Sequence, residues 1–278
     1  MAVTASSGAV DRIVRASLAE DLGSGDVTTD ATVDEGATGT AILVTRAPGV
    51  VAGLDAVEAV FRVLDPDVEV ERLAADGDVL PGPAEVARVS GSLRAILTGE
   101  RTALNLLGRL SGIATATRRY VDAVDGTGVA ILDTRKTTPG LRALEKHAVA
   151  AGGGRNHRFG LDDGVLVKDN HLAATGSIRA AVERLRVVTD LPVEVECDTL
   201  EQLQEALAAG AEAILLDNMS LDELRQAVAL TDGRARLEAS GGVTLETVRA
   251  IAETGVDEIS VGALTHSAPA LDVSLELT

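Results

Sequence analysis

The stretch VEVECDTLEQLQEALAAGAEAILLDNMSLDELRQAVALTDGRARLEAS, residues 193–240, decides the fold. It holds three short strand candidates, at 193–197, 213–218 and 236–240, of which 213–218 is the most apolar. Runs that are apolar on both faces are typical of strands in a parallel sheet covered by helices. The segments between the runs have the length and the apolar spacing of helices. This alternation predicts parallel strands joined by helices.

The same rhythm extends to both sides of this stretch. The further strand candidates are VAILDT (129–134), GVLVKD (164–169) and DEISVG (257–262). Six repeats of strand and helix predict a barrel or a doubly wound sheet. Because a closed barrel of this kind has eight strands, we expect an incomplete barrel in this part of the chain.

The residues before position 125 follow a different pattern, which predicts a small α+β unit. Helical spacing is found at 9–22 and 92–124. The strand candidates are 39–53, which contains two strands about a Pro-Gly turn, 67–73 and 84–91. The distant segment LDVSLEL (271–277) also alternates like a strand, and we expect it to return to this first unit.

Composition excludes several classes of function. The formal net charge of −18 and the near absence of aromatic residues argue against nucleic-acid binding, which uses basic surfaces and stacking platforms. Cys197 is the only cysteine, so no disulfide within the chain is possible and a cytoplasmic location is expected. The sequence has no signal-peptide pattern and no apolar run of the roughly 20 residues that a membrane-spanning helix needs.

Polar residues recur where the predicted barrel strands end. In barrels of this kind the carboxyl ends of the strands form the active site, so residues at these equivalent positions are expected to converge. The residues at these ends are Thr134, Arg135, Lys136, Lys168, Glu196, Asp217, Ser240, Gly241, Gly242 and Gly262.

The residue types at these ends indicate the ligand. Arg135, Lys136, Arg158 and Lys168, with His157 beside them, predict a positive pocket for a polyanion, because guanidinium groups grip carboxylates and lysine binds phosphate as a point charge. The sequences SGGV (240–243) and SVGA (260–263) end the last two strands, where barrels commonly hold a phosphate. Glu196 and Asp217 suit a hydrated Mg²⁺ on the phosphates of a substrate.

Each of these features has a plainer interpretation. An SGG sequence by itself is only a turn, and Glu196 or Asp217 alone is as consistent with a structural ion pair. Lys146 and His147 are interpreted as solvated or packing residues, and Cys197 as a small buried side chain. The glycines at 152–154 predict a helix end and a flexible connector. Arg155 and His171 receive no role. Arg101 shares a helix face with Asn105 and Gly108, and this face could reach a pocket or a partner subunit.

Long motifs in the chain resemble one known family. They are EDLGSGDVTTD (20–30), GERTALNLLGRLSGIAT (99–115), DTRKTTPGLRALEKHAV (133–149), GGGRNHRFGLDDGVLVKDNH (152–171), VEVE (193–196), LLDNM (215–219), EASGG (238–242) and ISVGALTHS (259–267). From about residue 10 onward the sequence closely resembles quinolinate phosphoribosyltransferases, which are also called carboxylating nicotinate-nucleotide pyrophosphorylases.

The resemblance implies a fold, a reaction and an assembly. The fold is an N-terminal α/β sandwich domain, expected at 1–112 with the tail 270–278, and an incomplete six-stranded α/β barrel, expected at 113–269. The reaction makes nicotinate mononucleotide, CO₂ and pyrophosphate from quinolinate and 5-phosphoribosyl-1-pyrophosphate, in de novo NAD synthesis. The assembly is a homodimer or larger, and no organic cofactor is implied.

The resemblance also implies residue roles. Lys136, Lys168, Glu196 and Asp217 would be catalytic. The quinolinate site would comprise Arg101 of a neighbouring subunit, Thr134, Arg135, His157, Arg158 and Lys168. The phosphoribosyl pyrophosphate site would comprise Lys136, Lys168, Glu196, Asp217, Ser240, Gly241, Gly242, Ser260, Gly262 and His266. Glu196 and Asp217 would hold Mg²⁺, either directly or through water and substrate.

Two other functions stay open from the residues alone. Lys168 could form a Schiff base, which would make the chain an aldolase-type lyase. The chain could also be a binder of an anionic metabolite, or a related pyrophosphorylase that acts in metal-cofactor transport.

Overall fold

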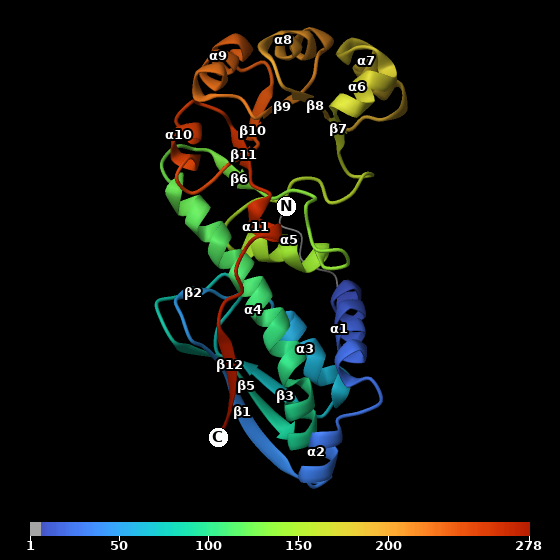
Figure 1. Ribbon diagram of the computed structural model, residues 1–278, viewed down its shortest axis with the longest axis vertical. Coiled ribbons are helices and arrows are strands. Elements are labelled where there is room, and N and C mark those ends of the chain that lie inside the picture. Colours follow the sequence, from blue (N-terminus) through green and yellow to red (C-terminus); the bar gives the residue numbers. More distant parts are fainter. Residues whose placement is uncertain (1–6) are drawn as a thin grey trace. The chain divides into compact units, whose positions relative to one another are not determined.

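The computed structural model describes residues 7–278, which form two compact units (Figure 1). Unit 1 runs to Arg118 and adds the segments Thr137–Gly153 and Ala263–Thr278. Unit 2 consists of Arg119–Lys136 and Gly154–Gly262. Each unit is therefore assembled from separate segments of the chain. The single boundary at residue 112 stays a prediction.

Unit 1 contains a four-stranded antiparallel sheet in the order β12-β1-β5-β3. These strands are Val273–Leu277, Thr38–Thr45, Ala84–Ser92 and Glu69–Arg72. A separate pair joins β2 (Gly49–Val50) to β4 (Val79–Leu80). The two strands expected within 39–53 therefore exist but do not pair with each other. Both edges of β1 are already occupied, by β12 and β5, so β2 pairs elsewhere.

The helices of unit 1 cover an aliphatic core. Their bounds are α1 Ser7–Leu22, α2 Val27–Thr32, α3 Leu54–Leu64, α5 Arg142–Ala151 and α11 Ala263–His266, while the long helix α4, Leu93–Ala123, continues into unit 2. Leu43, Leu54, Phe61 and Ile96 are fully buried between these helices and the sheet. With only three aromatic residues in the whole sequence, branched aliphatic side chains and alanines must fill this core.

Two glycines of α4 let the segment that leads into β12 pass close to the helix. A Cβ atom on Gly112 would lie 2.1 Å from the carbonyl oxygen of Pro269, and one on Gly108 would lie 2.9 Å from that of Leu271. The amide of Leu271 also donates a 2.9 Å hydrogen bond to the carbonyl of Gly108. Any side chain at position 112 would therefore push this segment away from α4.

Unit 2 contains six parallel strands in the order β6-β11-β10-β9-β8-β7. They are β6 Ala130–Leu132, β7 Val165–Val167, β8 Val193–Cys197, β9 Ala213–Asp217, β10 Arg236–Ser240 and β11 Glu258–Ser260. The helices are α6 Asp169–Thr175, α7 Ile178–Val188, α8 Leu200–Ala209, α9 Leu221–Thr231 and α10 Val248–Ala252. The α/β class and the six strands expected from the sequence are confirmed, and β6 and β7 form the two edges of an open sheet.

Local sequence signals start two of these helices. Helix α8 begins after Thr199, whose side chain accepts from the amide of Gln202, and Gln202 bonds back to the backbone of Thr199. Ser220 and Glu223 make the same reciprocal pair before α9. Such capping boxes satisfy backbone amides that have no partner within the helix, and they fix where each strand-to-helix loop ends.

No helix in residues 7–278 combines the length and the apolar character that a membrane crossing requires, and this includes α4.

Candidate active site

A cavity of about 420 Å³ lies at the carboxyl ends of the strands of unit 2. Every one of the six strands has a lining residue in its last positions or just after it. The lining residues are Thr134, Arg135, Lys136, His157, Arg158, Leu166, Lys168, Glu196, Leu215, Asp217, Glu238, Ser240 and Ser260. Most of the polar residues singled out from the sequence are therefore brought together, as expected where parallel strands end at one edge.

The segment after β6 is held by Asp133, which is fully buried. Its carboxylate accepts hydrogen bonds from Asn156 Nδ2 at 2.6 Å and from the amide of His157 at 2.9 Å. The amide of Arg155 donates to the carbonyl of Ile131 at 2.8 Å, so this stretch runs alongside the edge strand. These bonds place His157 and Arg158 next to Thr134 and Arg135, at the carboxyl ends of the strands.

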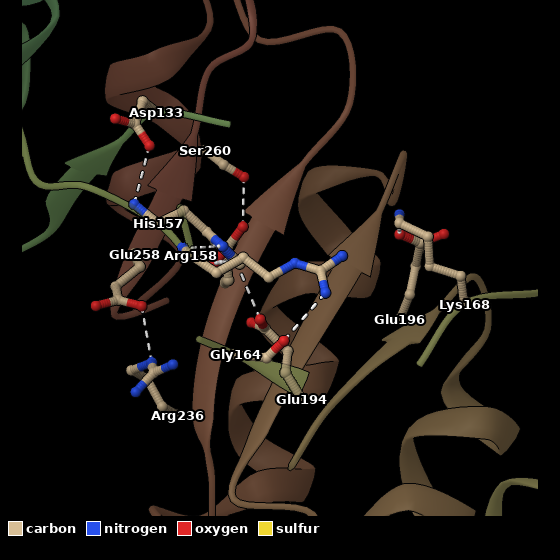
Figure 2. Close-up of polar contacts among 11 residues, drawn as sticks. Asp133, His157, Arg158, Gly164, Lys168, Glu194, Glu196, Arg236, Glu258 and Ser260 are labelled. Carbon is tan, nitrogen blue, oxygen red and sulfur yellow. Dashed lines mark hydrogen bonds and ion pairs between the residues drawn. The ribbon is translucent and has the colours of Figure 1, made fainter. Parts of the chain in front are cut away.

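His157 contacts two buried carboxylates inside the sheet (Figure 2). Its Nε2 lies 3.0 Å from Glu194 Oε2 and 3.4 Å from Glu238 Oε2. Ser260 donates a hydrogen bond to the other oxygen of Glu238. Burial lowers the pKa of His157, whereas the hydrogen bonds and charges of Glu194 and Glu238 act in the opposite direction and favour the ring proton on Nε2, the nitrogen that faces them.

Two guanidinium groups approach each other in the cavity. Burial, followed by the positive charge of Arg135, lowers the pKa of Arg158. Arg158 Nη1 donates to the carbonyl of Gly164 at 3.1 Å, whereas the buried Nε of Arg135 has no hydrogen-bond partner among the described residues. Like charges held together at partial burial are unfavourable unless an anion neutralises them, so this side of the cavity suits a carboxylated ligand.

The opposite side of the cavity carries acidic groups at the ends of neighbouring strands. Lys168 Nζ forms an ion pair with Glu196 on β8, and Asp217 at the end of β9 accepts a 2.6 Å hydrogen bond from Asn218 Nδ2. Gly241 has a φ of 94° and packs so tightly that a Cβ atom would lie 2.1 Å from Asn218 Oδ1. The loops after β9 and β10 can therefore approach each other only because position 241 is glycine.

Two family models match almost the whole chain. The model described as the N-terminal domain of quinolinate phosphoribosyl transferase matches residues 26–111, and the model described as its C-terminal domain matches residues 113–276. The chain belongs to the quinolinate phosphoribosyltransferase family.

Curated relatives and solved structures agree with this family. The nicotinate-nucleotide pyrophosphorylase [carboxylating] of Mycobacterium leprae is 48% identical over 274 residues, which cover 95% of this chain and 95% of the relative. The chloroplastic enzyme of the same name from Arabidopsis thaliana is 43% identical over 286 residues, covering 95% and 82%. The structure of the nicotinate-nucleotide pyrophosphorylase from Francisella tularensis superimposes with a TM-score of 0.94 at 39% identity, covering 100% of this chain and 99% of that one.

Several residues predicted for the quinolinate phosphoribosyltransferase site lie outside the cavity lining of the described chain. Gly241, Gly242 and Gly262 directly follow β10 and β11, in the loops behind Ser240 and Ser260. Arg101 is exposed on α4, and His266 is exposed in α11, where its Nδ1 lies 2.6 Å from Ser267 Oγ. Both belong to unit 1.

The structure also decides the plainer interpretations. Lys146 is fully buried in α5, so it is a packing residue and the solvated alternative is wrong. His147 Nε2 lies 2.7 Å from Asp76 Oδ2.

The interpretation of Cys197 as a buried side chain is confirmed, and burial raises the pKa of its thiol to about 12. Helix α5 ends before Gly152, as the glycine run predicted. His171 Nδ1 accepts from the amide of Lys168 at 2.9 Å and so caps α6.

Sequence reasoning missed Glu194 and Glu238. A usable signal was present, because side chains two residues apart along a strand point to the same face. Glu194 precedes Glu196 by two residues on β8, and Glu238 precedes Ser240 by two residues on β10. Both glutamates therefore had to face the sheet side that leads to the cavity, one layer deeper than the residues at the strand ends.

Proposed function

We propose that the cavity of unit 2 is the active site of this enzyme, a carboxylating nicotinate-nucleotide pyrophosphorylase of de novo NAD synthesis. The reaction transfers the phosphoribosyl group of 5-phosphoribosyl-1-pyrophosphate to quinolinate and releases pyrophosphate and CO₂. The observation that supports this location is one cavity with a cationic side, formed by Arg135 and Arg158, and an acidic side, formed by Glu196 and Asp217.

The cationic side would bind quinolinate. Arg135 and Arg158 offer planar donor groups that match the two carboxylates of this ligand. Thr134 and His157 would complete this site, and Lys168 would reach it from the acidic side of the cavity. Arg101 would reach this site from a second copy of the chain, in a homodimer or larger assembly. A binding dianion would relieve the repulsion between the two guanidinium groups.

The acidic side would bind phosphoribosyl pyrophosphate with Mg²⁺. Carboxylate oxygens of Glu196 and Asp217 are the ligand type that suits this ion, which usually keeps several waters and binds substrate phosphates. Once bound, the ion would supply positive charge to the leaving pyrophosphate. Ser240, Gly241, Gly242, Ser260, Gly262 and His266 would hold the 5-phosphate.

The chain's own cations would assist the departure of pyrophosphate. Lys136 would neutralise charge that develops on it, and Lys168, which pairs with Glu196, would supply a second cation for the same purpose. The pyridine nitrogen of quinolinate then bonds to the ribose carbon that pyrophosphate leaves. When CO₂ departs, the electron pair of the broken bond stays on the ring carbon, where the adjacent cationic nitrogen stabilises it until that carbon takes up a proton, so no covalent enzyme nucleophile is needed. The ion pair of Lys168 with Glu196 also fits poorly with the Schiff-base alternative, which needs a free amine.

A direct assay tests the location and the chemistry together. The protein is incubated with quinolinate, phosphoribosyl pyrophosphate and Mg²⁺, and nicotinate mononucleotide and CO₂ are measured. We expect both products from the wild type and a loss of quinolinate affinity in Arg135→Ala by calorimetry. Arg225→Ala, which changes an exposed arginine of α9, is the matched control. Unchanged affinity in Arg135→Ala would contradict the proposed site.

Complementation tests the role of Arg101 and the assembly. Arg101→Ala and Lys136→Ala are each expected to be nearly inactive. If Arg101 acts on the site of a neighbouring copy, a mixture of the two variants regains activity, because mixed dimers contain one intact site. A mixture that stays inactive while exchanging subunits would contradict this arrangement. A cytoplasmic location remains part of the proposal, to be checked by fractionation.

A further inference from the structure

Each ring nitrogen of His157 faces a protein partner. Nε2 points toward Glu194 Oε2 at 3.0 Å, and Nδ1 accepts a 2.7 Å hydrogen bond from the backbone amide of Arg158. Rotating the ring by half a turn would replace both nitrogens with carbons, so the two contacts together define the ring orientation. In this orientation His157 connects the buried glutamates to the main chain of Arg158.

We propose that Glu194 and Glu238 are positioning residues that hold His157 and, through it, set the location of Arg158 in the cavity. The inference rests on the proposed assignment of Arg158 to the quinolinate site. It changes the part played by His157 from a contact with substrate to an anchor for the neighbouring arginine.

The burial of the two glutamates supports this role. Glu194 is 5% exposed and Glu238 is 1% exposed. Buried carboxylates are costly unless they are paired, and two of them beneath a pocket for anions would also oppose ligand binding. Their pairing with His157, and the hydrogen bond from Ser260 to Glu238, offset the cost of burying the carboxylates. The repulsion of an anionic ligand is offset by an arginine that is held in place to bind that ligand directly.

Arg158 is held at three points that all belong to unit 2. His157 Nδ1 holds its amide, and the carbonyl of Gly164 holds its Nη1 at 3.1 Å (Figure 2). Gly164 also packs against its stem, because a Cβ atom at that position would lie 2.8 Å from Arg158 Cβ. Asp133 fixes the segment just before it, through the amide of His157. An arginine restrained in this way loses little freedom on binding a carboxylate.

The side chains of His157, Glu194 and Glu238 lie close enough together to hold a metal ion. A neutral histidine that ligates a metal through Nε2 carries its proton on Nδ1. Here Nδ1 faces the N–H of Arg158, which leaves no room for that proton. The hydrogen-bond pattern therefore favours the anchor over a metal centre.

Calorimetry on paired variants tests the proposal. Glu194→Gln keeps an acceptor for His157 Nε2, whereas Glu194→Met removes it. We expect Glu194→Met to weaken quinolinate binding about tenfold or more, the effect of losing a charge-assisted hydrogen bond, while Glu194→Gln stays within about threefold of wild type. Binding of phosphoribosyl pyrophosphate should change little in either variant. In ¹⁵N spectra the ring signals of His157 should shift in the methionine variant.

Two further variants make the outcome decisive. Glu258→Gln, on the neighbouring strand β11, alters a carboxylate that pairs with Arg236 rather than His157 and should leave quinolinate binding unchanged. Gly164→Ala displaces Arg158 directly and should weaken quinolinate binding even if Glu194→Met fails to fold.

The controls separate this inference from the proposed function. If Arg158→Ala also leaves quinolinate binding intact, the assignment of Arg158 to quinolinate fails. If Arg158→Ala weakens binding but Glu194→Met and Gly164→Ala do not, only the positioning role is overturned. Stoichiometric binding of Mn²⁺ or Zn²⁺ that is lost in Glu238→Gln would replace the anchor with a metal site.

Discussion

Arg109 on α4 donates a 2.9 Å hydrogen bond to the carboxylate of Glu145, which is fully buried on α5. The same guanidinium group donates to the carbonyls of Thr265 and Ala268, and Glu145 also accepts from the amide of Thr138 at 3.0 Å. This ion pair, in which Glu145 is buried and Arg109 is partly exposed, therefore ties together the three chain segments of unit 1.

Removing one partner of this pair should destabilise the protein strongly. Arg109→Met leaves the Glu145 charge buried without its cation, which typically costs about 3–5 kcal/mol. Unfolding in urea measures the loss. Arg225→Met breaks an exposed pair with Asp222 and should have little effect. Equal losses in the two variants would show that Arg109 has no special structural role.

The close approach at Gly112 predicts a second stability effect. Gly112→Ala places a methyl group 2.1 Å from the Pro269 carbonyl by the present geometry, so the segment before β12 must move. Overpacking of this kind costs about 1–3 kcal/mol, again measurable in urea. The control is Gly8→Ala in α1, where a Cβ atom has open space and helix propensity favours alanine. A Gly112→Ala protein as stable as Gly8→Ala would be incompatible with the observed packing.

The pair of His147 and Asp76 predicts a pH-dependent contribution to stability. His147 Nε2 donates a hydrogen bond to Asp76, which raises the pKa of His147 above 6.5. Burial raises the pKa of Asp76, but the hydrogen bond from His147 and those from backbone amides outweigh it and lower this pKa below 3.8. A raised histidine pKa stabilises the fold below pH 6.5, and this contribution is lost as the pH rises through the folded value. A lowered aspartate pKa stabilises the fold above pH 3.8 and is lost at more acidic pH.

The two contributions overlap between pH 3.8 and pH 6.5. The difference in unfolding free energy between wild type and His147→Gln should therefore be largest in that window and should shrink above it. Asp76→Asn should reproduce this profile, since it removes the other partner. A difference that stays constant from pH 4 to pH 9 would rule out the titration of this pair as its cause.

Asp217 gives a prediction about substrate binding. Asp217→Asn keeps the size of the side chain but removes the charge proposed to bind the metal-bound phosphates, so affinity for phosphoribosyl pyrophosphate with Mg²⁺ should fall about tenfold or more. Quinolinate affinity should change little. Asp222→Asn, an exposed change on α9, is the control for calorimetry. A loss confined to quinolinate would reverse the assignment of the two sides of the cavity.

The sequence predicted the six parallel strands because each is a short local run that alternates with a helical segment, and several of these runs are apolar. It predicted the polar strand ends because parallel strands end together. It did not predict which partner β2 takes, since pairing with β4 depends on β1 being fully paired already. The ion pair of Lys168 with Glu196 depends on the order of strands in the sheet, which no short motif encodes. The burial of Lys146 likewise depends on what packs over α5, and its sequence neighbours carry no sign of it.

The place of β12 in the sheet of unit 1 has a consequence for synthesis on the ribosome. β12 follows the whole of unit 2 in the chain but pairs with β1, near the start. Until it has been translated, one edge of β1 has no native partner, and exposed strand edges invite association between nascent chains. A stalled chain that ends before residue 273 should therefore depend on chaperones in a way that the finished protein does not.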